Sequence, residues 1–66
     1  MNTQQVITLA RKNVKTGKMQ DSAALCLEEA VKLYDNGDFA AAKKRALSSL
    51  RYSVGVFHAD YAQASK

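Results

Sequence analysis

The chain has 66 residues, which suits one small domain and is too short for a large catalytic unit. Apolar residues make up 47% of it, eleven of them Ala, and it contains no Pro, no Trp and three Gly. This composition excludes collagen, low-complexity disorder and a Pro-punctuated β-sandwich, and it favours helices because Ala is the strongest helix former. We therefore expect a single all-α domain over residues 1–66.

The formal net charge of +4 is unevenly distributed along the chain. Residues 1–20 carry four cations and no carboxylate, residues 21–39 carry five carboxylates and one cation, and residues 40–66 carry five cations and one carboxylate. Three packed helices in which two basic segments flank an acidic one would show this order. It also offers basic surfaces that attract an anionic partner.

Cysteine usage and the first residues bear on location. The single Cys26 excludes an internal disulfide and favours a reducing setting. Residues 1–5 have no basic or long apolar run typical of a signal peptide, and nowhere do eighteen apolar residues follow one another. We expect a soluble, cytoplasmic protein that does not cross a membrane.

Hydrophobic periodicity predicts a first amphipathic helix over residues 3–16. Asn2 or Thr3 is placed to cap its first turn, and Gly17 is placed to end it. Five side chains form the apolar arc of this helix: Val6, Ile7, Leu9, Ala10 and Val14.

A second helix is predicted over residues 23–35, with Asp21 or Ser22 as its N-cap. The strongest punctuation in the chain follows it, because Gly37 favours a left-handed helix terminus and Asp38 is a good N-cap. The flanks have helical periodicity, so we interpret this turn as the link of a helical hairpin over residues 23–62.

The third helix is predicted to be long, over residues 39–62, or about 36 Å against about 20 Å for the other two. It has a narrow apolar stripe: Phe39, Ala46, Leu50, Ser53, Val54, Phe57 and Tyr61. A small three-helix bundle would leave Val54, Phe57 and Tyr61 uncovered at its overhanging end, which favours self-association. The alternative is that the helix frays after Gly55, which weakens it by about 1 kcal/mol relative to Ala.

The core of this bundle follows from the same periodicity. We expect Leu50 and Ala46 of the third helix to pack against the second helix, with the first helix closing the core. The remaining predicted core residues are Leu27, Val31, Leu33, Ile7 and Val14.

Residues 24–42 resemble a single tetratricopeptide helical hairpin. Ala30, Leu33, the run Gly37-Asp38-Phe39, Ala42 and, further on, Leu50 occupy that family's characteristic positions, whereas Cys26 replaces its early Trp and its terminal Pro is missing. The resemblance implies a helical hairpin. One repeat does not imply a peptide-binding groove, because such arrays need three or more units for stability.

The same hairpin also resembles the HEPN helical superfamily, many of whose members cleave RNA. The residues that carry this resemblance are the turn at Gly37 and the pair Arg51 and His58, which six residues separate. It implies that His58 takes part in acid–base chemistry and that Arg51 contacts a phosphate. Tyr52 stands where that family has a polar residue, and the chain ends soon after His58.

Lys44, Arg51 and His58 are spaced seven residues apart and would form a stripe along one face of the long helix. A polyanion lying along this stripe could contact all three, and the alternative is a solvated flank near the acidic second helix. With one His, one Cys and no repeated ligand spacing, we expect no metal and no cofactor.

These observations favour a small, non-enzymatic α-helical protein–protein interaction module that binds a protein partner or forms a homodimer through its third helix. The alternative is a basic nucleic-acid-binding protein, with HEPN-like RNA cleavage as its most specific form. Salt separates the two, because contacts to a polyanion weaken steeply with salt and an apolar interface does not.

Overall fold

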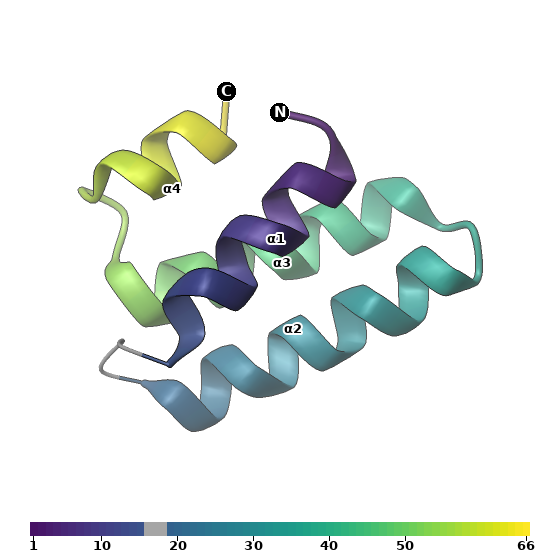
Figure 1. Ribbon diagram of the computed structural model, residues 1–66, viewed down its shortest axis with the longest axis horizontal. Helices are drawn as coiled ribbons and strands as arrows, with labels where there is room; N and C mark the ends of the chain where they lie inside the picture. The colour runs from purple at the N-terminus through teal and green to yellow at the C-terminus, as the bar shows by residue number, and fades with distance from the viewer. Residues whose placement is uncertain (16–18) are drawn as a thin grey trace.

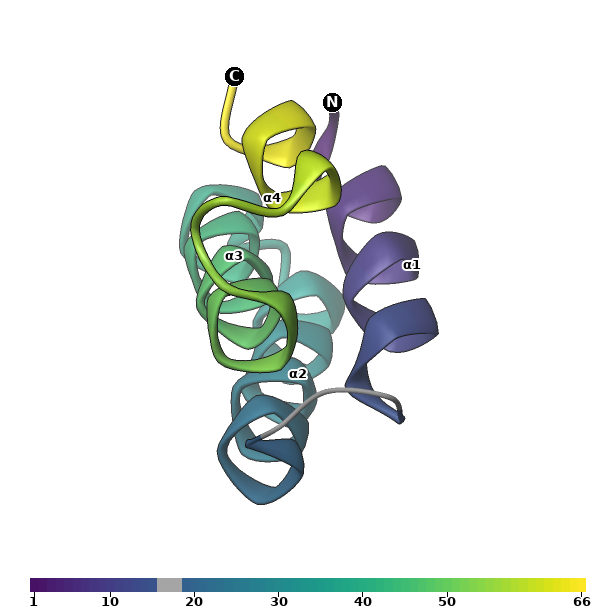
Figure 2. The ribbon, with the colours of Figure 1, turned by 90° about the vertical axis from the view of Figure 1, so that its left-hand side faces the viewer.

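The computed structural model describes residues 1–15 and 19–66, and this part of the chain forms four helices without strands (Figure 1). They are α1 (Thr3–Val14), α2 (Gln20–Asp35), α3 (Phe39–Val54) and α4 (Ala59–Ala64). α3 packs against both α2 and α1, and these two contact each other less extensively. Seen end on, α2 and α4 lie on opposite sides of the α1–α3 pair (Figure 2). The prediction of an all-α fold is confirmed.

α1 begins with a reciprocal capping arrangement. The Gln5 N–H donates to Asn2 Oδ1 (2.8 Å), and the Asn2 N–H donates to Gln5 Oε1 (2.9 Å), so Asn2 is the N-cap. Thr3 Oγ1 donates to the Phe39 carbonyl oxygen (3.1 Å) and ties the start of α1 to the start of α3. The helix ends at Val14, two residues before the predicted end, and the predicted terminator Gly17 lies outside the described residues.

The α2–α3 turn is as the sequence predicts. Gly37 has a φ of 85°, its N–H donates to the Tyr34 carbonyl (3.0 Å), and the side chain of Asp38 caps α3. The start of α2 differs from the prediction, because the helix begins at Gln20 after Met19, which makes no side-chain cap. Asp21 therefore lies inside the first turn, where its carboxylate interacts favourably with the helix dipole.

The prediction of a long third helix over residues 39–62 is wrong. α3 ends at Val54, because Gly55 adopts a φ of 87° and its N–H donates to the Arg51 carbonyl (3.0 Å). A turn leads from there into α4, so the chain neither continues straight to residue 62 nor frays. The reversal lets α4 bury Ala64 against the core, and this burial outweighs the helix that a straight continuation would add in solvent. The result, within the described residues, is an all-helical fold of four packed helices, of which α4 is the shortest.

The centre of the core is built from small side chains around Leu50, which is fully buried. Ala46, Leu50 and Ile7 are buried as predicted, whereas Leu27, Val31, Leu33 and Val14 are only half-buried. The reason is that Ala10, Ala30 and Ala46 face one another and bring the helices close, so the larger side chains surround the contact. Ser49 Oγ also donates to the Ala23 carbonyl (2.7 Å) and joins α3 to α2 inside the bundle.

Candidate interaction surfaces

The most exposed large apolar side chain among the described residues is Phe57, in the turn between α3 and α4. Its relative exposure is 100%, and Val56 beside it is 42% exposed. Tyr52, two residues before the end of α3, is 41% exposed. We call these three residues, Tyr52, Val56 and Phe57, the Phe57 corner. Three exposed apolar side chains within six residues of the chain make this segment a candidate interaction surface.

Two of the three predicted interface residues do not belong to this surface. Val54 and Tyr61 are half-buried and pack against the core of their own chain. Because the break at Gly55 turns α4 back over the bundle, the side chains expected on an overhang are covered intramolecularly. Only Phe57 of the predicted set projects into solvent.

The predicted basic stripe is also interrupted. Lys44 and Arg51 are exposed and share a face of α3, as their spacing requires. His58 lies beyond the helix break and forms the N-cap of α4, so the prediction that it continues the stripe is wrong. No hydrogen bond or ion pair joins Arg51 to His58 in the described chain.

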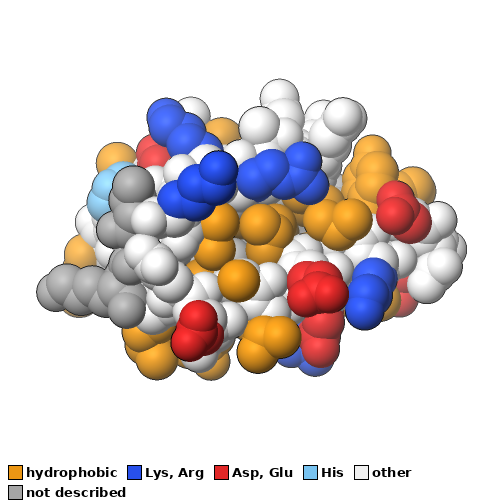
Figure 3. Space-filling model, turned by 60° about the horizontal axis from the view of Figure 1, so that its bottom comes forward, with side chains coloured by type: hydrophobic (Ala, Val, Ile, Leu, Met, Phe, Trp, Pro, Cys, Tyr) orange, Lys and Arg blue, Asp and Glu red, His pale blue; other side chains and the backbone are white. Residues whose placement is uncertain are grey.

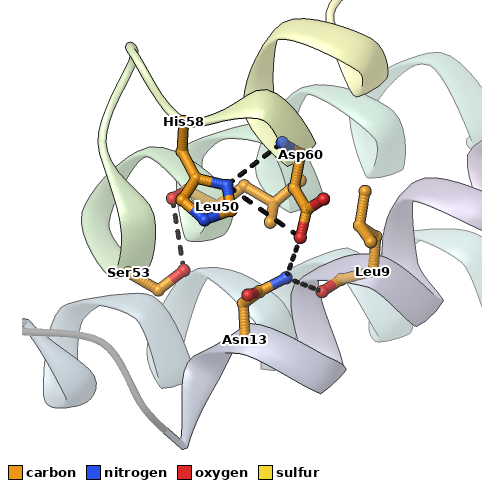
Figure 4. A network of polar contacts seen from close by, with 6 residues as sticks. All are labelled: Leu9, Asn13, Leu50, Ser53, His58 and Asp60. Carbon is orange, nitrogen blue, oxygen red and sulfur yellow. Dashed lines mark hydrogen bonds and ion pairs between the residues drawn. The ribbon is translucent and has the colours of Figure 1, made fainter.

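His58 instead belongs to a polar network that fixes α4 (Figure 4). The Asp60 N–H donates to His58 Nδ1 (3.1 Å), so the ring nitrogen Nδ1 acts as an acceptor. Asn13 Nδ2 donates both to Asp60 Oδ2 (3.1 Å) and to the Leu9 carbonyl (2.9 Å), which links α1 to α4. These contacts give His58 and Asp60 a structural role. Sequence reasoning missed Asn13, whose only signal was a polar residue on the apolar side of α1.

The residues that the structure describes contain no group of three or more His, Cys, Asp or Glu that could hold a metal ion. Cys26 is a half-buried free thiol on α2.

A second candidate surface is the groove between α1 and α2. A hollow of about 210 Å³ lies here. We call it the α1–α2 groove, and its lining residues are Gln4, Ile7, Thr8, Arg11, Val31, Tyr34 and Asp35. Figure 3 shows this side of the molecule: Lys and Arg side chains lie along the upper edge, with apolar side chains beneath them. Asp and Glu side chains, with further Lys or Arg side chains among them, lie below and to the right. The sequence signal for it was the change from a basic to an acidic segment.

No protein-family model matches this chain, and no curated protein or solved structure matches it either. None of the helices in residues 1–15 and 19–66 is long and apolar enough to cross a membrane. The Phe57 corner and the α1–α2 groove are the two candidate interaction surfaces of this fold.

Proposed function

We propose that this protein is a small, non-enzymatic α-helical interaction module that forms a homodimer through the Phe57 corner. The observation that carries the proposal is the complete exposure of Phe57, in a fold small enough to need its apolar side chains for its own core. The turn that presents Phe57 depends on the left-handed conformation of Gly55. Covering Phe57 with a partner would remove its whole side chain from water, which is favourable.

A two-fold axis at the corner would bury Phe57 of each copy against the other copy. Burying a Phe side chain stabilises the complex by about 1.5–3 kcal/mol, and the exposed parts of Val56 and Tyr52 add to this. Association also costs translational and side-chain entropy, which absorbs much of the gain. We therefore expect a weak to moderate dimer, and a foreign protein is the other partner that this surface would suit.

The alternative class is nucleic-acid binding, for which the net charge of +4 and the exposed pair Lys44 and Arg51 speak. The helix break separates His58 from Lys44 and Arg51, and its Nδ1 accepts the Asp60 N–H. This arrangement favours the interaction module over the HEPN-like form. The single Cys26 and the absence of a membrane-spanning helix in the described residues support a cytoplasmic setting.

Sedimentation equilibrium at about 100 μM protein and about 0.5 M salt tests the proposal, because such salt screens charge contacts and leaves apolar ones. The parent should be dimeric and Phe57→Ser monomeric, with unchanged helical circular dichroism. Leu25→Ser is the matched control, because Leu25 is 64% exposed on α2 and lies outside the corner. It should remain dimeric.

A monomeric parent, or a Phe57→Ser variant that dimerises like the parent, contradicts homodimerisation through the corner. If the parent also binds a short RNA with steep salt dependence, and Lys44→Glu or Arg51→Glu weakens that binding, the nucleic-acid alternative is correct.

A further inference from the structure

The two walls of the α1–α2 groove carry opposite charges that form no ion pair within the described chain. Arg11 of α1 and Asp35 of α2 both line the hollow, yet no ion pair joins them or engages either one elsewhere in the described chain. Asp35 occupies the last turn of α2, where a carboxylate opposes the helix dipole. Asp35 therefore does not stabilise the monomer through the helix dipole or through an ion pair with another described residue.

The imbalance extends along both helices. Residues 3–15 contain three exposed cations and no carboxylate, namely Arg11, Lys12 and Lys15, of which Arg11 lines the groove. None of the three is in an ion pair within the described chain. α2 has four carboxylates and one cation. Glu28 pairs with Lys32 (3.9 Å) and Glu29 with Arg45 of α3 (3.1 Å). Asp21 and Asp35 have no such partner among the residues that the structure describes.

We propose that the α1–α2 groove docks the same groove of a second copy of this chain about a two-fold axis. An axis that passes between Arg11 and Asp35 exchanges their positions, so Arg11 of each copy faces the partner's Asp35. The basic wall of each copy thereby lies against the acidic wall of the other. The apolar floor formed by Ile7, Val31 and Tyr34 loses its contact with water.

Charge pattern decides in favour of a second copy. A polyanion would be attracted by the α1 wall and repelled by the α2 wall a helix away, whereas a copy of the same chain is complementary to both walls at once. This surface is separate from the Phe57 corner and does not rest on the proposed function. If both surfaces are used, each copy contacts two others, and assembly at low salt proceeds beyond a dimer.

The test uses Phe57→Ser as its background, since this variant lacks the apolar contact of the corner whatever that corner does. Sedimentation equilibrium should show this variant as a dimer at about 20 mM salt and as a monomer at about 0.5 M, because the shorter screening length weakens the charge contacts. If the Phe57→Ser variant is monomeric at low salt, the proposal is overturned. Binding of a short RNA in an Arg11-dependent manner by that monomer would not rescue it.

Charge exchange then locates the contact. In this background Arg11→Glu and Asp35→Arg should each weaken dimerisation by about tenfold or more, because each sets like charges against each other at both symmetry-related contacts. An equimolar mixture of the two should form a heterodimer, in which both contacts are complementary again. Circular dichroism checks that each variant is folded.

Lys44→Glu is the control for Arg11→Glu, because it makes the same change in net charge at an exposed position of α3 and should leave the dimer intact. Three results overturn the proposal: undiminished dimers of either single variant, failure of the mixture to associate, or an equal loss with Lys44→Glu. Each of them leaves the result for the Phe57 corner at high salt unaffected.

Discussion

The two turns on either side of α3 each contain a glycine with almost the same left-handed φ, 85° at Gly37 and 87° at Gly55, but they do different things. The first joins two sixteen-residue antiparallel helices, and the second joins α3 to a helix of six residues. Gly37 is followed by Asp38, whose side chain caps the next helix. Gly55 is followed by Val56 and Phe57, which project into solvent.

This difference teaches that the same backbone device can serve folding or display. After Gly37 the chain enters α3 directly, and Phe39, although 53% exposed, packs edge-on against Tyr34 with ring centroids 5.0 Å apart. After Gly55 the chain first presents Phe57 and returns only with Tyr61 and Ala64. The first turn completes the hairpin, and the second also creates the surface that we propose for self-association.

The largest expected effect tests whether both turns depend on one core. Leu50→Ala removes the largest fully buried side chain and should lower the free energy of unfolding by about 2–5 kcal/mol, because it leaves a cavity beneath α4 and between α1 and α2. A thermal melt followed by circular dichroism measures this. Leu25→Ala, at an exposed position of α2, should melt close to the parent, and equal melts of the two variants would remove Leu50 from the centre of the core.

The two glycines themselves provide the next test. A Cβ at either position meets no atom within 4 Å, so a substitution acts through the backbone conformation alone. Gly37→Ala should lower the free energy of unfolding by about 1–2 kcal/mol, since Ala is strained at positive φ and Asp38 still requires a turn here.

Gly55→Ala should cost less than Gly37→Ala, because the chain can exchange the strained turn for a longer α3 at the expense of the docked α4. Chemical denaturation gives the two losses of stability, and backbone NMR shifts show whether residues 55–58 become helical. Equal losses with α4 still docked would contradict this distinction between the two turns.

The smallest effect concerns the caps. His58→Ala removes the acceptor of the Asp60 N–H, and a lost N-cap costs about 0.5–2 kcal/mol. The loss should open α4 locally without unfolding the bundle, and His58→Asn should restore the cap. Amide hydrogen exchange measures it, with faster exchange in α4 only. Asp38→Ala, at the cap of α3, should instead destabilise the whole fold.

The presence of the first three helices, a cap at Asn2 or Thr3 and the turn at Gly37 could be predicted from the sequence alone, because each depends on interactions within a few residues. Hydrophobic periodicity and a capping side chain suffice for such features. The opposite charges of α1 and α2 were partly predictable in the same way, since the order of basic and acidic segments can be read from the sequence. Arg11 and Asp35 could not be placed on one groove without the packing of α1 and α2 on α3.

The end of α3 was decided only by the tertiary structure. A glycine within a helix costs about 1 kcal/mol, so periodicity alone favoured a continuous helix through Gly55. The outcome depends on packing Ala64 and Tyr61 with the core cluster that contains Leu50. It also depends on the hydrogen bond between Asn13 and Asp60, which lie 47 positions apart in the chain. Because this long-range burial exceeds a small local preference, the chain turns back, covers Val54 and Tyr61, and leaves Phe57 in solvent.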